Sequence, residues 1–134
     1  FDEQECNQTM GFKIAYLGLG VAGTKMCPEA KFATQGGRLQ GGVIAALADV
    51  TMGLAAATVY GQLYRTLDLS MNYLAPGFAD TELTAETNVI HPGKTIALVE
   101  GSLFSKGKLI AKSRGTFIRD KKIQRTGDSV VWGD

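Results

Sequence analysis

The chain has 134 residues, of which 45% are hydrophobic and 20% are charged, and its formal net charge is +1. This length and composition predict one domain over residues 1–134 that can bury a core. The near-neutral charge gives no electrostatic case for binding nucleic acid or an anionic membrane. Cys6 and Cys27 have no CxxC spacing and no accompanying histidine cluster, which predicts free thiols, a cytoplasmic location, and neither a disulfide framework nor a zinc site.

The first third of the chain is expected to form a lead-in and a hairpin. Residues 1–10 are polar and acidic, so they are predicted to form a short helix or a frayed end. Two strands punctuated by glycines follow between Phe12 and Lys31, and Pro28 predicts an edge position or a bulge in the second strand. A loop over residues 33–39 then leads into the next element.

The segment from Gly42 to Ala57 predicts a buried central helix. It consists mainly of alanine and larger apolar residues, and its one formal charge is on Asp49. A helix that is apolar on every side belongs in the middle of a domain, and Gly61 provides a natural end. A membrane span is not expected, because the run contains Asp49 and several glycines.

Asp49 is the unusual residue of this helix. A carboxylate in an apolar setting costs several kcal/mol unless it is paired, so its pKa is expected to rise. Perturbed carboxylates cluster at functional sites. The alternative is a structural Asp that points out of the packing or bonds to a neighbouring backbone group.

Glycines lead directly into the helix and leave its first backbone N–H groups uncovered. Such groups can stabilise an oxyanion, although an ordinary glycine-rich helix start is the alternative. Gly41 and Asp49 are eight residues apart, which is roughly 12 Å along one helix and too far for both to contact one carbonyl. If they cooperate, the helix start must come from a second copy of the chain, as a two-fold axis would arrange.

The remainder of the chain predicts antiparallel strands. Residues 64–74 alternate strictly, which predicts a strand with one buried face. The side chains expected on that face are Leu67, Leu69, Met71 and Tyr73. Further strands are expected over residues 82–90, 95–104 and 109–119, with turns at 91–94 and 105–108. A helix that follows two strands and precedes four more predicts an α+β fold with an antiparallel sheet around one helix.

Two features of the later segments have open interpretations. His91, the only histidine, falls in a predicted turn and is expected to be a loop residue. Residues 120–134 are expected to form a solvated C-terminal tail with Trp132 tucked back on the body. The alternative for the tail is that Lys121, Lys122 and Arg125 meet the phosphates of a coenzyme A-like ligand.

As a set, these segments resemble hotdog-fold acyl-CoA thioesterases of the phenylacetate-degradation (PaaI-like) type. The segment from Gln40 to Asp49 is similar to the HGG-x6-D signature of that family. Residues 66–76 are similar to the strand after the central helix, and residues 93–95, 107–111 and 115–117 are similar to the closing strands. The resemblance covers roughly residues 10–119 and implies a hotdog fold, in which an antiparallel sheet wraps around one long helix.

The resemblance implies hydrolysis of an acyl-CoA, or a related acyl thioester, to a free acid and a thiol. It assigns Asp49 as the nucleophile or general base and the Gly41 backbone N–H as the oxyanion donor. Gln40 stands where the family usually has His, so its amide can donate a hydrogen bond to the carbonyl but cannot titrate. Thr66 falls at the place of a hydroxyl residue that helps to hold the carboxylate or the water, and a solvent-facing Thr is the alternative.

The remaining expectations concern binding and assembly. The expected substrate-binding residues are Gly42, Thr34, Gln35, Met52 and Gly53. The family commonly has an amide side chain in the loop before the helix. This chain has Thr34 at that position and Gln35 next to it, so only a one-residue shift of the loop would place an amide there. Met52 and Leu54 are expected to line a pocket that faces a neighbouring subunit.

The resemblance implies no metal or redox cofactor, since coenzyme A enters only as part of the substrate. It implies a homo-oligomer that is at least a dimer, and a homotetramer as a dimer of dimers. One alternative is a catalytically silent acyl-CoA-binding or assembly module. Another is a hydratase or dehydratase of the same fold, for which His91 stands in the wrong context.

Overall fold

The computed structural model describes residues 1–120, 123–126 and 129–132. Lys121 and Lys122 of the predicted basic cluster therefore lie outside the described residues, and the side chains of Arg125 and Trp132 lie outside the described side chains. The elements in chain order are α1 (Glu5–Met10), β1 (Lys13–Gly18), β2 (Val21–Met26), η1 (Ala30–Phe32), η2 (Gln35–Gly37), α2 (Gly41–Tyr60), β3 (Tyr64–Tyr73), β4 (Leu83–Pro92), β5 (Ile96–Ser105), β6 (Lys108–Arg119), β7 (Ile123–Thr126) and β8 (Ser129–Trp132).

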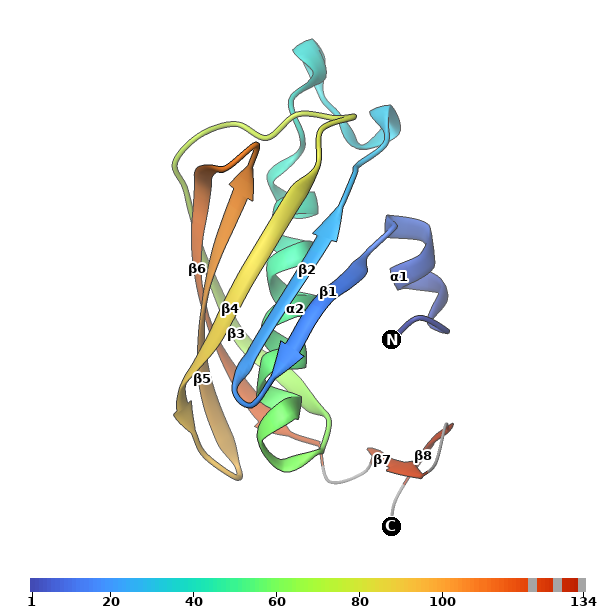
Figure 1. Cartoon of the computed structure of the whole chain (residues 1–134), viewed down its shortest axis with the longest axis vertical. Coiled ribbons are helices and arrows are strands. Elements are labelled where there is room, and N and C mark those ends of the chain that lie inside the picture. The colour runs from blue at the N-terminus through green and yellow to red at the C-terminus, as the bar shows by residue number, and fades with distance from the viewer. Residues whose placement is uncertain (121–122, 127–128, 133–134) are drawn as a thin grey trace.

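Six strands form one antiparallel sheet in the order β1-β2-β4-β5-β6-β3, and helix α2 packs along it (Figure 1). Strands β7 and β8 form a separate two-stranded sheet, where the sequence pattern predicts no strand. The predicted α+β architecture, an antiparallel sheet around one central helix, is confirmed. Gly61 ends α2 as predicted, with φ of 66° and its N–H bonded to the Ala57 carbonyl at 2.9 Å.

Helix α2 is buried on one side only. The residues that pack against the sheet are Val43, Ile44, Leu47, Ala48, Thr51, Met52, Ala55 and Ala56. Ala46, Asp49, Val50 and Gly53 are only half-buried. The expectation of a helix buried on every side is therefore wrong for a single chain, because one sheet covers one side. By length and hydropathy α2 could also cross a membrane, a property that it shares with core helices.

Buried threonines fix the rotation of α2 against the sheet. The Oγ1 atoms of Thr24 on β2 and Thr51 on α2 are 2.5 Å apart. Thr51 Oγ1 donates its hydrogen to the Leu47 carbonyl at 2.6 Å. The hydrogen bond between the two threonines is therefore donated by Thr24. Thr87 on β4 donates to the Ala22 carbonyl at 2.9 Å. With Thr51 held on the sheet side, Asp49 lies on the half-buried side of the helix.

The predictions for the first hairpin need one correction. Strand β2 pairs with β1 on one side and β4 on the other, so it is an interior strand. It ends at Met26, and Pro28 therefore lies beyond the strand, where it removes no ladder hydrogen bond. The irregularity of this hairpin falls in β1, between Ile14 and Tyr16.

Strand β3 is an edge strand, and its predicted buried face is only partly covered: Leu69 and Met71 pack against the core, while two other side chains are exposed. Leu67 and Tyr73 are 56% and 49% exposed. Among the described residues β3 pairs only with β6, so its other edge has no neighbouring strand. A bulge between Thr66 and Asp68 also breaks the strict alternation.

The last two hairpins follow the prediction with one shift. His91 and Pro92 lie at the end of β4, where His91 pairs with Leu98, because an irregularity after Val89 lets the ladder continue. The turn lies at residues 93–95 instead. Lys106 and Gly107 form the predicted β5–β6 turn, and both have positive φ, 51° and 76°, which is typical of a two-residue type I′ hairpin.

Candidate functional site

Asp49 and Thr66 form a hydrogen-bonded pair between α2 and β3. Thr66 Oγ1 donates to Asp49 Oδ1 at 2.6 Å. Among the described residues no cation pairs with Asp49, and no donor is bonded to its Oδ2. One carboxylate oxygen is thus held by a neutral hydroxyl, while the other is available for chemistry.

This pair lies in the wall of a cavity of about 550 Å³. The apolar part of the wall consists of Phe1, Val50, Gly53, Leu54, Ala57, Leu63 and Phe117, and the polar part of Glu3, Gln4, Asn7, Asp49, Tyr64 and Thr66. Helix α1 and the segment before it close one side of this space. A cavity of this size, with an apolar part to its wall and a carboxylate in its polar part, suits a small organic acyl group.

The start of α2 forms a second feature of the site. The N–H groups of Gly41 and Gly42 precede the first intrahelical hydrogen bonds, and no described residue accepts a hydrogen bond from either. Gln40 is the exposed N-cap residue, and its side chain makes no capping hydrogen bond. Gly41 lies in a hollow of about 380 Å³, lined by Arg38, Leu39, Gly41, Ile44, Tyr73, Leu74, Ala75, Pro76 and Gly77.

The two features do not meet within one chain. The cavity with Asp49 does not contain Gly41, and the hollow with Gly41 does not contain Asp49. Their eight-residue separation corresponds to roughly 12 Å along α2. A single chain therefore presents a carboxylate and a pair of backbone donors at two different places.

Two of the predicted substrate-binding residues lie in the cavity or at the helix start, and two others lie in the loop before the helix. Gly53 lines the Asp49 cavity and Gly42 lies beside Gly41. Thr34 and Gln35 are exposed around η2, in neither cavity, and Thr34 Oγ1 donates to the Arg38 carbonyl at 3.1 Å.

The structure does not bring Met52 to the cavity. Its side chain is fully buried on the sheet side of α2, where Ser113 Oγ approaches the Met52 sulfur at 3.7 Å. Leu54, two residues further along the helix, does line the cavity.

Tyr73 is the residue of this region that sequence reasoning missed. Its hydroxyl donates to the Gly41 carbonyl at 2.6 Å. The alternating pattern of β3 counts Tyr73 as one more apolar residue of a buried face, and no local signal links it to a glycine 32 residues earlier. The part that residues 1–7 play in the cavity wall is hidden from the sequence for the same reason.

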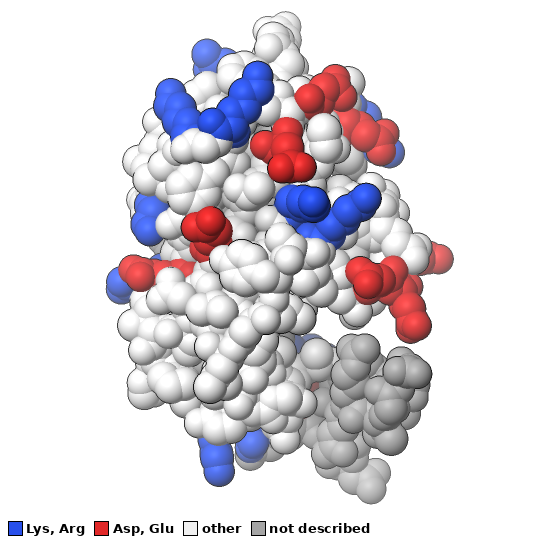
Figure 2. All heavy atoms as spheres, viewed as in Figure 1, with Lys and Arg blue, Asp and Glu red and all other residues white. Residues whose placement is uncertain are grey.

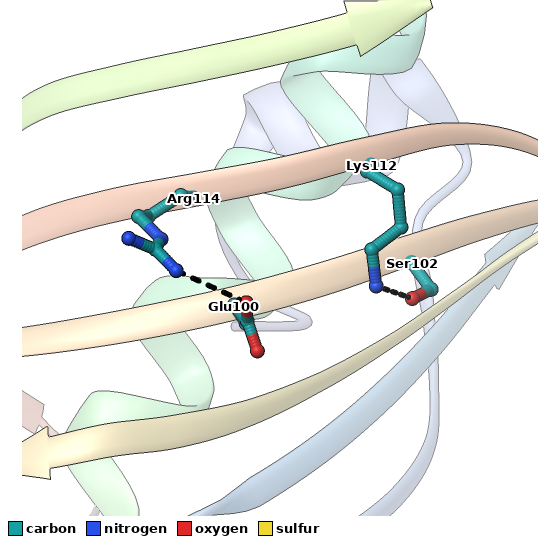
Figure 3. A network of polar contacts seen from close by, with 4 residues as sticks. All are labelled: Glu100, Ser102, Lys112 and Arg114. Carbon is teal, nitrogen blue, oxygen red and sulfur yellow. Dashed lines mark hydrogen bonds and ion pairs between the residues drawn. The ribbon is translucent and has the colours of Figure 1, made fainter. Parts of the chain in front are cut away.

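Charged residues elsewhere do not contribute to either feature. On the outer face of the sheet Arg114 pairs with Glu100 at 3.3 Å and Lys112 donates to Ser102 at 2.7 Å, and these side chains point away from α2 (Figure 3). In the view of Figure 2, charges of both signs lie mainly over the upper half of the molecule, and the lower half carries few among the described residues. Within the described part of the chain, no three His, Cys, Asp or Glu residues are grouped as a metal site would require.

Comparisons with known proteins identify relatives of this chain by sequence. The family model described as the thioesterase superfamily matches residues 36–111. The "Putative esterase SSO2140" of Saccharolobus solfataricus is 35% identical to this chain over 115 residues, which are 84% of this chain and 81% of that protein.

Solved structures extend the similarity over most of the chain. The conserved protein PA5202 of Pseudomonas aeruginosa is 32% identical, with a TM-score of 0.81 over 87% of this chain and 94% of that one. The PaaI protein of the phenylacetic acid degradation operon of E. coli is 26% identical, with a TM-score of 0.84 over 89% and 86%. A hypothetical thioesterase of Streptococcus pneumoniae solved with coenzyme A is 24% identical, with a TM-score of 0.77 over 86% and 88%, and shares the fold.

Proposed function

Because this chain belongs to the thioesterase superfamily and has the hotdog fold, we propose that it hydrolyses an acyl-CoA, or a related acyl thioester, to a free acid and a thiol. The observation that carries the proposal is the Asp49–Thr66 pair in the wall of a cavity that can hold an acyl group. The esterase name of one relative and the coenzyme A in one structure of the same fold support the reaction class and the substrate class.

Asp49 supplies the reactive carboxylate in this proposal. As a general base, its Oδ2 takes a proton from a water molecule whose oxygen attacks the thioester carbon. As a nucleophile, Oδ2 attacks that carbon itself, and water then hydrolyses the mixed anhydride. In both routes the C–S bond breaks and the thiolate leaves and is protonated. Thr66 holds Oδ1, so that Oδ2 is the oxygen directed to the substrate.

The oxyanion is stabilised by the helix start of a second copy. The Gly41 N–H donates to the carbonyl oxygen as negative charge develops there, and the Gln40 amide adds a hydrogen bond. Two antiparallel α2 helices beside a two-fold axis bring Gly41 of one chain to Asp49 of the other. The half-buried apolar side of α2 supports this pairing, because it is the surface that a second helix would cover. The working unit is then at least a dimer, and a homotetramer as a dimer of dimers.

A panel of acyl-CoA substrates in a free-thiol release assay tests the function. The Asp49→Asn variant should lose at least about 10² in turnover while it stays folded, because a half-buried charge is replaced by an amide that can still accept the Thr66 hydrogen bond. Asp68→Asn is the matched control, since Asp68 is an exposed carboxylate on the same strand as Thr66.

The controls separate the alternatives. Near-full turnover by Asp49→Asn would refute the carboxylate mechanism. An acyl-CoA that binds to the wild-type protein, but is not cleaved at any pH, would indicate the silent binding module instead.

A further inference from the structure

The start of α2 is a pair of glycines that few contacts hold in place. The N-cap side chain of Gln40 makes no capping hydrogen bond, and the first turn contains no acidic residue. Glycine loses more backbone freedom on folding than any other residue. Backbone donors stabilise an oxyanion best when they are oriented before the charge develops. The Gln40 carbonyl, which shares a peptide unit with the Gly41 N–H, accepts a hydrogen bond from the Val43 N–H at 3.0 Å. Further ordering of the unit between Gly41 and Gly42 comes from outside the helix.

Tyr73 supplies such a contact from the end of β3. Its hydroxyl donates to the Gly41 carbonyl at 2.6 Å, and within the described part of the chain this is the only side-chain hydrogen bond to residues 40–42. The ring also lies against Gly41, because a Cβ atom built on Gly41 would be 3.1 Å from both the Cζ and the Oη of Tyr73. Gly41 does not have a positive φ, so the tyrosine ring is the contact that a larger residue at this position would push against.

We infer that Tyr73 is a positioning residue for the backbone N–H donors of Gly41 and Gly42. The inference rests on the proposed function, in which the start of α2 stabilises the oxyanion. The Gly41 carbonyl and the Gly42 N–H belong to one peptide unit, so a hydrogen bond to the carbonyl polarises that unit and strengthens its N–H as a donor. Tyr73 needs no contact with the substrate to do this.

Two further observations fit this role. The chain is fixed on the other side of Gly41 by the Leu39 N–H, which bonds to the Gly77 carbonyl at 2.9 Å. The Gly41 N–H thus lies between two anchored peptide units. Burial raises the pKa of the Tyr73 hydroxyl above its ordinary value, which keeps the proton on this donor well above neutral pH.

Tyr73→Phe tests the inference, because it keeps the ring and removes the hydroxyl. We expect kcat to fall about three- to tenfold, as for the loss of one neutral hydrogen bond, with KM and the thermal midpoint nearly unchanged. Tyr60→Phe is the matched control. The Tyr60 hydroxyl also donates to a backbone carbonyl, that of Pro92 at 2.9 Å, but at the opposite end of α2. Wild-type kcat in Tyr73→Phe, or an equal fall in Tyr60→Phe, would overturn the inference.

An amide NMR spectrum gives a readout that does not depend on catalysis. Loss of the hydrogen bond to the Gly41 carbonyl should move the Gly42 amide proton upfield in Tyr73→Phe and leave it in place in Tyr60→Phe. An unmoved Gly42 resonance would overturn the inference even if the protein cleaved no thioester. Conversely, a kcat lost in Asp49→Asn but kept in Tyr73→Phe would leave the proposed function standing and refute this role alone.

A fluorinated tyrosine at position 73 covers the case in which Tyr73→Phe does not fold. It keeps the size and the hydrogen bond but loses its proton at lower pH, after which it can no longer donate. The alkaline fall of kcat should then begin at a lower pH than in the wild type. An unchanged alkaline limb would contradict the positioning role.

Discussion

Thr66 and Tyr73 lie on one edge strand, and their hydroxyls hold two points of the same helix. Thr66 donates to the Asp49 carboxylate and Tyr73 to the Gly41 carbonyl, each at 2.6 Å. Strand β3 therefore sets the position of both groups that the proposed reaction needs. In a two-fold dimer these two groups serve different active sites, so each β3 would contribute to both.

Thr66→Val removes the hydroxyl and keeps the shape of the side chain. The hydrogen bond that it removes is to a charged group, worth about 1.5–3 kcal/mol, so we expect kcat to fall about 10- to 100-fold. Steady-state kinetics on the best acyl-CoA of the panel measures the effect. Thr116→Val is a control on the neighbouring strand β6, where Thr116 pairs with Asp68. Full activity in Thr66→Val would show that Thr66 is only a surface threonine.

Mixed oligomers test whether the site is shared. Neither Asp49→Asn nor Gly41→Val should be active alone, since the latter places a side chain against the Tyr73 ring. In a random mixture half of the dimers are hybrids, and one site in each hybrid has both intact groups. Co-refolding equal amounts should therefore restore about a quarter of the wild-type sites for a two-fold dimer. A mixture that stays inactive would contradict the shared site. So would light scattering that finds the wild-type protein to be a monomer while it turns over substrate.

Gln40 gives a prediction about pH dependence. Gln40→Ala should lose about one to two kcal/mol of transition-state stabilisation, the range for a hydrogen bond left unmade, and the acidic limb of the kcat/KM profile should not move. Gln40→His should add an inflection near the ordinary histidine pKa of about 6.5. Wild-type kinetics of Gln40→Ala on every accepted thioester would assign Gln40 to the loop, without a role in the reaction.

The buried threonine pair predicts a change in stability. Thr24→Val leaves Thr51 Oγ1 without its buried donor, which should lower the free energy of unfolding by about 1–3 kcal/mol. Thr24→Val combined with Thr51→Val should cost less than the sum of the single variants, because the double variant leaves no orphaned hydroxyl. Urea unfolding of the three variants measures this. Strictly additive losses would show that the two hydroxyls do not interact.

Alkaline pH should destabilise the fold through its tyrosines. Burial is the main cause that raises the pKa of Tyr16, Tyr64 and Tyr73 above 10.0. The folded state therefore binds these protons more tightly than the unfolded state does. The resulting stabilisation is complete below the unfolded-state pKa of about 10, and it is lost as the pH rises through the folded-state pKa of each tyrosine. Urea unfolding at pH 8 and above pH 10 should show the loss. Tyr16→Phe should reduce it, and an unchanged pH slope in that variant would contradict the assignment.

The sequence predicts the central helix, its end at Gly61 and the separation of Gly41 from Asp49, because these depend on composition and helix geometry. It does not predict which side of α2 faces the sheet. The helix is apolar all round, so no stripe distinguishes Met52, which is buried against the sheet, from Leu54, which lines the cavity. The side of α2 that faces the sheet is fixed by the buried contact between Thr24 on β2 and Thr51 on α2, which a local sequence pattern does not reveal.

Strand β3 shows a second limit of the same kind. Its alternation predicts an apolar face correctly, yet burial of that face depends on a covering element that local sequence does not specify. The fold of one chain leaves Leu67 and Tyr73 exposed. The hydrogen bond from Tyr73 to Gly41 is equally invisible, because the periodicity of a strand gives no information on the reach of a particular hydroxyl.

The two edges of the sheet differ in their protection against unwanted strand addition. Strand β1 has six residues, a lysine at its start and a register break after Ile14, which are features that discourage another chain from pairing with it. Strand β3 has ten residues, and its single bulge lies near one end. From Asp68 to Tyr73 the ladder is regular, so alternate residues of β3 direct their backbone groups away from β6 at the open edge, with exposed Leu74 just beyond. An isolated copy of the chain would thus expose β3 as a template for aggregation, and the proposed dimer would protect the chain during folding only where it covers this edge.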